Sequence, residues 1–345
     1  MKSEELVELD AQEFEAVTRE VDVPVEQSLL WDAFDRAVPG RRPWRRFVYR
    51  SEGEPVAVVA LSEYRVRGFR YLWAKHGPVW FAEPSAELER RLEDRLVATV
   101  RSLDRGIVFL RLHTARPTQR HHRLLQSVTY DRTVVVELAG RSDEEILASM
   151  KKRGRRDLRK GLREQPVVCT EETGLSAGAF EREMYAVLRE TAARDGFRLH
   201  PVAVYTTMLE TLGPRACRLF VGRHEGQVQA WTIVTVHDGA ATAYYAASTA
   251  EGRAHDAPTQ LYWHVIRTLR DEGVRTFDLM GIGSELAPSL EGLTTMKTKF
   301  SETVTEVAPA WDLPVRPAVY ASLRAALRAK RGAGDIVRRL RGARG

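Results

Sequence analysis

The sequence predicts an α/β (α+β) fold made of two similar domains in tandem, and three observations lead to this prediction. The chain has 345 residues, 43% of them hydrophobic, so it is long enough for two hydrophobic cores of ordinary size. A strand, turn, strand pattern recurs at an offset of 173 residues, about half the chain. Each copy is followed by a helical segment and a further strand, which is typical of a sheet crossed by a helix.

The repeat begins with a hairpin in each half. The segments Phe47-Val-Tyr-Arg-Ser-Glu-Gly53 and Phe220-Val-Gly-Arg-His-Glu-Gly226 both read as a strand that ends in a Glu-Gly turn. An acidic residue before glycine favours a tight hairpin, because such turns need positive φ. A further strand follows each hairpin, with Tyr71 and Tyr244 at equivalent places.

A helix and another strand complete each copy. We expect helices at residues 88–105 and 260–272, leading through Gly106 and Gly273 into strands at 107–112 and 274–279. The joint is expected near residues 142–150. The predicted domains are therefore 1–147 and 148–315, followed by a basic helix at 316–345 that we expect to pack back on the first domain.

Basic charge is concentrated in two segments. The net charge is +6, whereas residues 151–163 alone carry +7 and residues 316–345 carry +8, so the remainder is acidic. The sequence therefore predicts two local cationic surfaces on a protein that is otherwise acidic. In the first segment, Leu158 and Leu162 form a narrow apolar stripe that we expect to dock a helix. The phosphate-binding candidates on its other faces are Lys152, Arg155, Arg156 and Arg159, and a merely solvated face stays an alternative.

Other sequence features exclude several classes of protein. Cys169 and Cys217 fit neither a disulfide framework nor a metal spacing, so we expect no metal and a reducing cytoplasmic location. The acidic N-terminal segment lacks the apolar core of a secretory signal, and no apolar run is long enough to span a membrane. His121 and His122 read as part of a solvated loop.

The order of elements is compatible with the acyltransferase fold of the N-acetyltransferases (GNAT). Those proteins usually carry a glycine-rich loop that holds the pyrophosphate of coenzyme A on a helix N-terminus. The nearest glycine pair here, Gly281-Ile-Gly283, follows a strand without a third glycine. We therefore expect no coenzyme A and no other cofactor.

Several short motifs, in the right order, carry a more specific resemblance. Gln27-Ser-Leu-Leu-Trp31, Lys75-His-Gly-Pro78 and the basic segment that starts at Ser149 come first. Thr191-Ala-Ala-Arg-Asp-Gly-Phe197, Phe277-Asp-Leu-Met-Gly281, Gly292-Leu-Thr-Thr-Met-Lys297 and Trp311-Asp-Leu-Pro-Val315 follow. Together they resemble the FemABX family of aminoacyl-tRNA-dependent peptidoglycan bridge-forming transferases, in a compact form without the coiled-coil arm. The sequence departs from the family pattern at His76, Gly161 and Met296.

The resemblance implies two tandem acetyltransferase-like domains and a reaction. An amine on the lipid-linked or nucleotide-linked stem peptide of a peptidoglycan precursor attacks the ester of an aminoacyl-tRNA. The implied catalytic residues are Lys297 with Asp278 or Asp195 as proton acceptor. The implied substrate-binding residues are Arg36, Arg194, Tyr244, Tyr245 and Met296, with strand alternation sending one tyrosine ring inward and one outward.

Alternatives remain open on the sequence alone. In the first alternative, the enzyme uses aminoacyl-tRNA to acylate a small secondary metabolite. In the second, the chain has no catalytic role and only binds a polyphosphate or RNA. The basic C-terminal helix packs on the first domain, touches the tRNA, or lies on the anionic inner leaflet of the membrane. A monomer is the default expectation.

Overall fold

The computed structural model describes residues 4–66, 68–125, 127–164 and 166–342, with only the backbone described for residues 330–342. The last three residues of the predicted C-terminal helix lie outside this range. The chain forms two compact units. Unit 1 comprises residues 1–21, 40–128 and 309–345, and unit 2 comprises residues 22–39 and 129–308. These units divide the chain differently from the predicted ranges 1–147 and 148–315. Residues 22–39 lie within the first predicted range but belong to unit 2, and residues 309–315 lie within the second but belong to unit 1.

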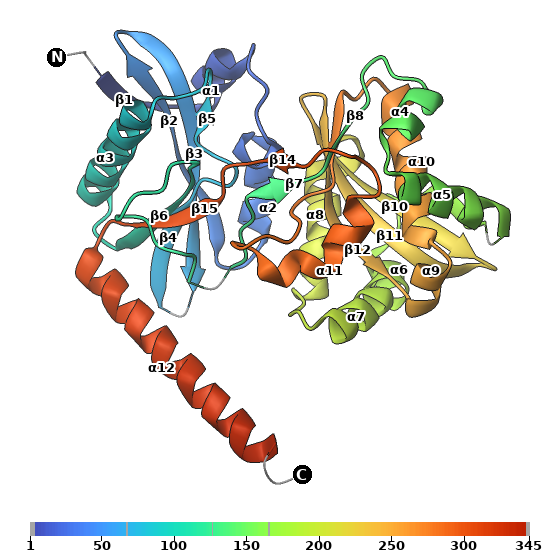
Figure 1. Cartoon of the computed structure of the whole chain (residues 1–345). Helices are drawn as coiled ribbons and strands as arrows, with labels where there is room; N and C mark the ends of the chain where they lie inside the picture. The colour runs from blue at the N-terminus through green and yellow to red at the C-terminus, as the bar shows by residue number, and fades with distance from the viewer. Residues whose placement is uncertain (1–3, 67, 126, 165, 343–345) are drawn as a thin grey trace. The chain divides into compact units, whose positions relative to one another are not determined.

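Unit 1 is built on one mixed sheet (Figure 1). Its strands lie in the order β1 (Glu4–Leu9), β2 (Arg41–Ser51), β3 (Glu54–Val66), β4 (Phe69–Trp73), β6 (Ile107–His113) and β15 (Ala310–Pro314), with β5 (Val79–Trp80) beside β3. The helices of unit 1 are α1 (Ala11–Thr18), α3 (Ala86–Leu103) and α12 (Pro317–Gly342). Leu92, Leu96 and Val100 of α3 pack on one face of the sheet, and Tyr320 of α12 packs on the other.

Unit 2 contains the second sheet (Figure 1). Its strands lie in the order β8 (Val135–Glu137), β13 (Thr276–Asp278), β12 (Ala240–Ser248), β11 (Gln227–His237), β10 (Cys217–His224) and β9 (Val168–Glu171), and β7 (Arg132–Thr133) pairs with β14 (Thr305–Glu306) apart from it.

Helices cover both faces of this second sheet. One face packs on α4 (Asp143–Ser149), α5 (Lys152–Glu164) and α10 (Ala257–Asp271), and the other packs on α2 (Leu30–Ala37), α6 (Ala177–Arg182), α7 (Met184–Asp195) and α8 (Val202–Ala216). Shorter elements are η1 (Val25–Gln27), α9 (Ala250–Ala254), η2 (Pro288–Leu290) and α11 (Glu291–Lys297). The sheet is therefore buried on both sides, as its nearly continuous apolar strands require.

The duplication predicted from the sequence is confirmed strand by strand. In both hairpins the Glu-Gly pair has positive φ, at Glu52 and Gly53 and at Glu225 and Gly226. The next strand pairs antiparallel in each sheet, and the strand after the crossing helix pairs parallel, β6 with β4 and β13 with β12. The two sheets thus share one order and one set of strand directions.

The last strand of each sheet is exchanged. β15 follows unit 2 in sequence but pairs antiparallel with β6 of unit 1, whereas β8 precedes most of unit 2 and pairs antiparallel with β13. Shifting β8 by the repeat offset of 173 residues brings it onto the start of β15. The two equivalent strands have therefore changed places between the copies.

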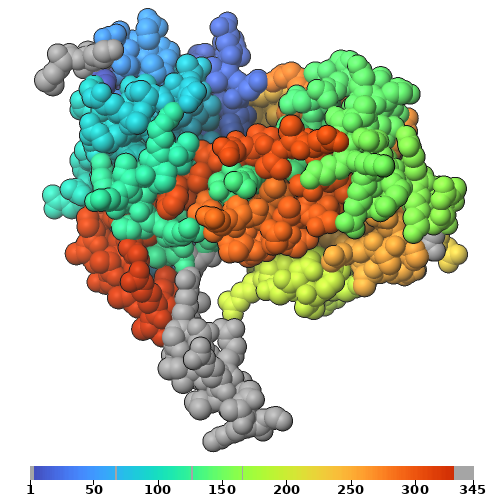
Figure 2. Space-filling view, in the orientation of Figure 1, coloured from blue at the N-terminus to red at the C-terminus, as the bar shows by residue number. Residues whose placement is uncertain are grey.

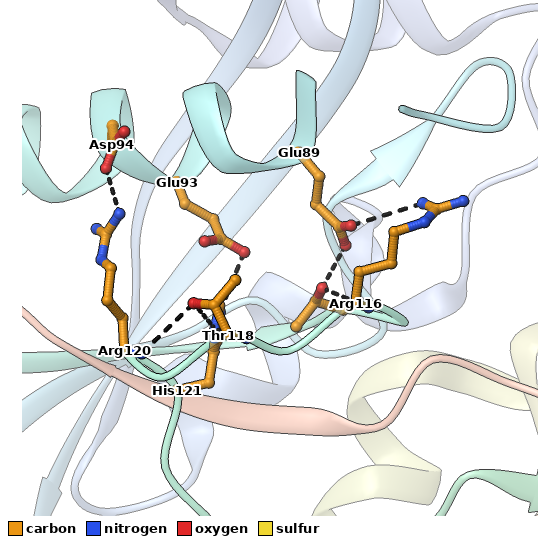
Figure 3. A network of polar contacts seen from close by, with 8 residues as sticks. Glu89, Glu93, Asp94, Arg116, Thr118, Arg120 and His121 are labelled. Atoms are coloured by element: carbon orange, nitrogen blue, oxygen red, sulfur yellow. Dashed lines mark hydrogen bonds and ion pairs between the residues drawn. The ribbon is translucent and has the colours of Figure 1, made fainter. Parts of the chain in front are cut away.

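A polar network ties the segment after β6 to helix α3 (Figure 3). The ring of His121 is buried, its Nε2 lies 3.1 Å from Glu93 Oε1, and its Nδ1 accepts from the backbone N–H of Thr118 at 3.0 Å. Arg116 and Arg120 form ion pairs with two further carboxylates of α3, those of Glu89 and Asp94. The interpretation of this stretch as a solvated loop was wrong for His121, because Glu93 of α3 and the backbone N–H of Thr118 satisfy its two ring nitrogens inside the unit.

Candidate active site

A β-bulge in β12 sets the geometry of unit 2. Ile233 of β11 faces Tyr245 while the next residue, Val234, faces Ala243, so Tyr244 is the extra residue of the bulge. A bulge shifts the alternation of side chains along a strand. As a result Ala243 packs toward α10, whereas Tyr244 and Tyr245 both pack toward α2 and α8. The prediction that the two rings point to opposite faces was therefore wrong.

The two tyrosines belong to an aromatic cluster on that face. The ring of Tyr244 lies 5.5 Å from Trp31 of α2 and 5.2 Å from Tyr245, centroid to centroid. Tyr245 continues the chain of contacts, 4.7 Å from Tyr205. Edge-to-face and tilted aromatic pairs at these distances stabilise a face that is only partly covered. Arg36, on the same helix as Trp31, is largely exposed and lies 3.4 Å from Asp32.

A cavity of about 100 Å³ lies where the ends of α7 and β12 meet α10 and α11. Three predicted residues line it, namely Arg194, Asp195 and Met296. The other lining residues are Thr191, Ala230, Trp231, Ala246, Ala247, Ser248, Arg253, Pro258, Leu261, Tyr262, Gly292 and Leu293. A space of this size accommodates a small chemical group.

The polar wall of this cavity is preorganised by Arg194. Its guanidinium donates to both carboxylate oxygens of Asp195, at 2.9 and 3.2 Å, and to the carbonyl of Ser248 at 3.0 Å. Thr191 adds two hydrogen bonds to the backbone of Ser248, which fix the end of α7 on the end of β12. Since both oxygens of Asp195 already accept from Arg194, this carboxylate holds the arginine in place.

Lys297 lies in a second polar cluster and does not line the cavity. The residue is only 8% exposed, and its Nζ donates to the carbonyls of Met280 and Gly281 at 3.2 and 2.9 Å. Burial lowers the pKa of Lys297 to about 8, and the negative charge of Asp278 opposes this shift. A lysine with such a pKa exchanges its proton near neutral pH, unlike an exposed lysine.

The end of β13 shapes the surroundings of Lys297. Asp278 accepts hydrogen bonds from the hydroxyl of Thr133 and, at 2.7 Å, from the backbone N–H of Met280. Met280 has positive φ, which turns the chain so that two successive carbonyls face the lysine. At Gly281 a Cβ would lie 2.4 Å from the ring of Tyr130, so this position has no room for a side chain. The structure thus brings Lys297 and Asp278 into one cluster and leaves Asp195 in another.

The basic helix α5 docks differently from the predicted stripe. Leu162 is 48% exposed, and the buried positions are Gly154, Asp157, Leu158 and Gly161. The two glycines bring the backbone of α5 close to its neighbours, since a Cβ at Gly161 would lie 2.6 Å from the side chain of Gln260. The stripe prediction was wrong at Leu162 because it considered large apolar residues only.

The cationic side chains on α5 face solvent, except that of Arg155. Lys152, Arg156 and Arg159 are exposed, whereas Arg155 donates to the carbonyls of Leu147, Ala148 and Met150 at the end of α4. The carbonyl of Leu147 also accepts from the backbone N–H of Met150, and Arg155 adds a side-chain donor to this helix end, so Arg155 caps α4. We therefore regard Arg155 as a structural residue first, and Lys152, Arg156 and Arg159 as the accessible cations.

Lys299 is a residue that the sequence analysis missed. Its ammonium is buried and lies 3.0 Å from Asp157 of α5, 2.7 Å from Asp256 and 3.3 Å from the hydroxyl of Thr259. Burial alone would raise the pKa of Asp157, but hydrogen bonds from Lys299 and Arg156 hold it below its usual value. These partners lie far away along the chain, so no local pattern indicated them.

Substituting Gly154 tests how α5 is seated. A Cβ there would lie 2.3 Å from the backbone oxygen of Lys299, which cannot move aside as a side chain could. We expect Gly154→Ala to lower the free energy of unfolding by about 1–3 kcal/mol, despite the better helix propensity of alanine. Gly178→Ala in α6 is the matched control, because its nearest contact is the end of Arg182 at 3.4 Å. Equal urea midpoints for the two variants would contradict the close docking.

Comparisons with known proteins agree with this architecture. Residues 148–286, less than half of the chain, match the model of an acetyltransferase (GNAT) domain. No curated protein matches the chain. Among the described residues, no helix is both long and apolar enough to cross a bilayer.

Solved structures resemble the chain over nearly its whole length. The crystal structure of FemX has a TM-score of 0.69 at 12% identity, covering 93% of this chain and 100% of that one. The C-terminal domain (DUF2156) of a putative lysylphosphatidylglycerol synthetase from Agrobacterium fabrum has a TM-score of 0.54 at 16% identity, with 92% and 95% covered. A tandem GNAT protein from the clavulanic acid biosynthesis pathway has a TM-score of 0.53 at 14% identity, with 91% and 99% covered. The predicted fold class is confirmed, and the chain is a tandem GNAT-fold protein that resembles FemX in structure.

Proposed function

We propose that this chain is an aminoacyltransferase that moves an amino acid from an aminoacyl-tRNA to an amine of a peptidoglycan precursor. The observation that carries the proposal is Lys297, a buried lysine held by two backbone carbonyls with its pKa lowered to about 8. Its motif, Gly292–Lys297, is also one of those that together resemble the transferases of this type. The fold shared with FemX supports the same conclusion.

The proposed reaction is aminolysis of an ester. The acceptor nitrogen forms a bond to the carbonyl carbon of the amino acid, the bond from that carbon to the ribose oxygen breaks, and the ribose oxygen gains a proton. The attacking ammonium must first lose a proton, and neutral Lys297 is the proposed group that accepts it. The ester is already activated, so positioning of both substrates supplies much of the remaining rate.

The other residues take the roles that their contacts suit. We assign the cavity lined by Arg194 and Met296 to binding a small part of a substrate. Arg36, Tyr244 and Tyr245, on the face covered by α2 and α8, are assigned to further substrate contacts. Asp278 lies in the cluster of Lys297 and opposes the shift of its pKa, so we assign it to holding the charge balance there. Asp195 is assigned to orienting Arg194.

The N-terminus of α10 favours a donor other than coenzyme A. A helix binds pyrophosphate through the free N–H groups of its first turn. Here Pro258 lacks an N–H in that turn, and the carboxylate of Asp256, just before the helix, accepts from Lys299. This arrangement offers a phosphate fewer free N–H donors, so we propose that transfer needs no coenzyme A.

A labelled-transfer assay tests the proposal. The full chain is incubated with tRNA carrying labelled amino acids and with a lipid-linked precursor, a nucleotide-linked precursor or a small soluble amine. We expect RNase-sensitive transfer of label to a precursor. Transfer to the small amine alone would favour acylation of a secondary metabolite, a reading that the likeness to the clavulanic acid pathway protein keeps open. Label that stays on the tRNA with every acceptor would leave only a binding role.

The same proposal gives α5 the role of holding the tRNA backbone. Lys152 and Arg159 are exposed and form no ion pair within the described part of the chain. Each lost phosphate contact lowers the slope of log affinity against log salt by about 0.7–0.9, so Lys152→Gln/Arg159→Gln is expected to lower it by about 1.5. Arg182→Gln/Arg215→Gln, which removes equal charge from α6 and α8, is the control. Equal slopes in all three proteins would return α5 to a solvated face.

We further propose that the protein acts as a monomer in the cytoplasm. Its acceptor is then reached either in solution or at the inner leaflet of the membrane.

A further inference from the structure

Unit 1 contains a cavity lined by arginine and leucine alone. It has a volume of about 160 Å³ and lies between α12 and the segment that follows β6. The lining residues are Arg123, Leu124, Leu125, Arg324, Leu327 and Arg328. Figure 2 shows the described part of α12, in red, against unit 1. The cavity has no part in the proposed transfer reaction, whose residues lie in unit 2.

Both walls of the cavity are fixed to one buried carboxylate. Asp312 accepts from the backbone N–H of Leu125 at 3.2 Å and from the hydroxyl of Tyr320 in α12 at 3.1 Å. The backbones of His122 and Asp312 also exchange two hydrogen bonds of 2.9 Å. Leu125, Leu327 and Tyr320 belong to one apolar cluster. The arginines are therefore carried by segments that are already held in place before any ligand binds.

One of the arginines is oriented by a neutral partner. Arg324 Nη1 lies 2.9 Å from His122 Nδ1, and the histidine ring stacks on Tyr320 with centroids 5.2 Å apart. Burial lowers the pKa of His122, and the charge of Arg324 lowers it further, so the imidazole accepts this hydrogen bond in its neutral form. Arg324 thus keeps its full positive charge and its remaining N–H groups.

None of the residues that line the cavity is acidic. Arg328 follows Arg324 by one helical turn, and within the described residues neither of them forms an ion pair. Guanidinium groups recognise phosphate through paired N–H donors, and a phosphate among them would relieve their mutual repulsion. The leucines supply an apolar wall that suits an acyl-glycerol group. The ribose of an RNA backbone offers no apolar surface to match it.

We infer that the cavity lined by Arg123, Arg324 and Arg328 binds the phosphate of an anionic phospholipid. Arg324 and Arg328 hold the phosphate oxygens while Leu124, Leu125 and Leu327 contact the glycerol end of the acyl chains. The site attaches unit 1 to a lipid surface at the start of α12. Since unit 2 contains the proposed transfer site, this inference stands or falls independently of the proposed function.

Flotation of the full chain with vesicles tests the site. We expect binding to phosphatidylcholine vesicles that contain phosphatidylglycerol and little binding to phosphatidylcholine alone. A basic residue near an anionic surface contributes about fivefold to binding, so Arg324→Gln/Arg328→Gln is expected to lower the partition coefficient about 25-fold. Arg328→Gln alone removes no contact within the described residues and is expected to lower the partition coefficient about fivefold. This single variant still tests the site if the double variant loosens the packing of α12.

The control variant carries the same loss of charge elsewhere on unit 1. Arg19 and Arg105 are exposed, so Arg19→Gln/Arg105→Gln should lower the partition coefficient less than threefold. Equal losses in both double variants would show attraction by net charge only and overturn the site. Absence of wild-type flotation would also overturn the site. It would do so even if inorganic phosphate or tRNA raised the melting temperature of the wild type and not of Arg324→Gln/Arg328→Gln, because the bound phosphate would then not be that of a lipid.

Discussion

Lys297→Met is expected to abolish transfer and, at pH 7, to make the protein more stable. Loss of the proton acceptor should lower the transfer rate at saturating substrates by about 10²–10⁴-fold. Folding currently buries a charge: the pKa falls from 10.5 to about 8, which corresponds to a cost of about 3 kcal/mol at pH 7. Methionine removes that cost but leaves two carbonyls without the lysine, at about 1–2 kcal/mol, so the net gain should be about 1–2 kcal/mol.

The effect of Lys297→Met on the free energy of unfolding should depend on pH. A lysine whose pKa is lowered in the folded state destabilises the fold fully below pH 8, and the cost disappears as pH rises toward 10.5, where the unfolded chain also loses the proton. The stability difference between wild type and Lys297→Met should therefore shrink and reverse between pH 7 and pH 10.5. Urea unfolding of both proteins at several pH values measures it. The wild-type transfer rate should rise with pH through about 8.

Lys160→Met serves as the control for loss of a lysine, because Lys160 is exposed beside Glu164. It should change neither the pH profile nor the unfolding free energy by more than ~0.5 kcal/mol. A wild-type rate that falls through pH 8 would mean that Lys297 acts as a cation, and an unchanged rate in Lys297→Met would remove it from the mechanism.

Asp312→Ala is expected to lower the free energy of unfolding of unit 1 by about 3–5 kcal/mol. Asp312 is fully buried, and the guanidinium of Arg111 lies 2.7 and 3.2 Å from its two oxygens. Burial raises the pKa of Asp312 while Arg111 opposes the shift, so the pair exists only because each charge compensates the other. Alanine would leave Arg111 buried and unpaired among the rings of Tyr71, Trp73 and Phe109.

Two companion variants separate this charge effect from a simple loss of volume. Arg111→Met/Asp312→Leu removes both charges and should be far less destabilising than Asp312→Ala. Glu5→Ala, on the exposed side of β1, should change the unfolding free energy by less than ~0.5 kcal/mol. Because Tyr320 loses its acceptor in Asp312→Ala, α12 should also become more sensitive to limited proteolysis. A loss below ~1 kcal/mol would mean that the ion pair contributes little.

The parts of the fold that depend on local chemistry could be predicted from the sequence. Glu52-Gly53 and Glu225-Gly226 revealed the duplicated hairpins because a tight turn imposes its own residue types. The bulge at Tyr244 could not be predicted, since it depends on the pairing of β12 with β11. The exchange of β8 and β15 was also missed, because the choice between two equivalent sheets is made by contacts remote in sequence.

The candidate site, too, has parts that could be predicted from the sequence and parts that could not. Lys297 and Arg194 were identified by resemblance, which records residue types at motif positions and not their partners. The sequence therefore did not indicate that Arg155 caps α4 or that Lys299 joins Asp157 to Asp256. Each of these contacts depends on which polar groups meet in the folded chain, and the sequence offers many alternative partners for each of them.

The exchanged strands also bear on how the gene can be divided. A fragment that ends at residue 147 would carry β8 without β13 and would leave the edge of β6 open, and the fragment that begins at residue 148 would carry β15 without β6. Unpaired edges of this kind recruit strands from other molecules. Each half would find its missing strand in the other half, or in a second copy of the complete chain. Duplication of an ancestor that already traded this strand between two subunits would give the same arrangement, so the tandem chain has the topology of a strand-swapped dimer joined into one polypeptide.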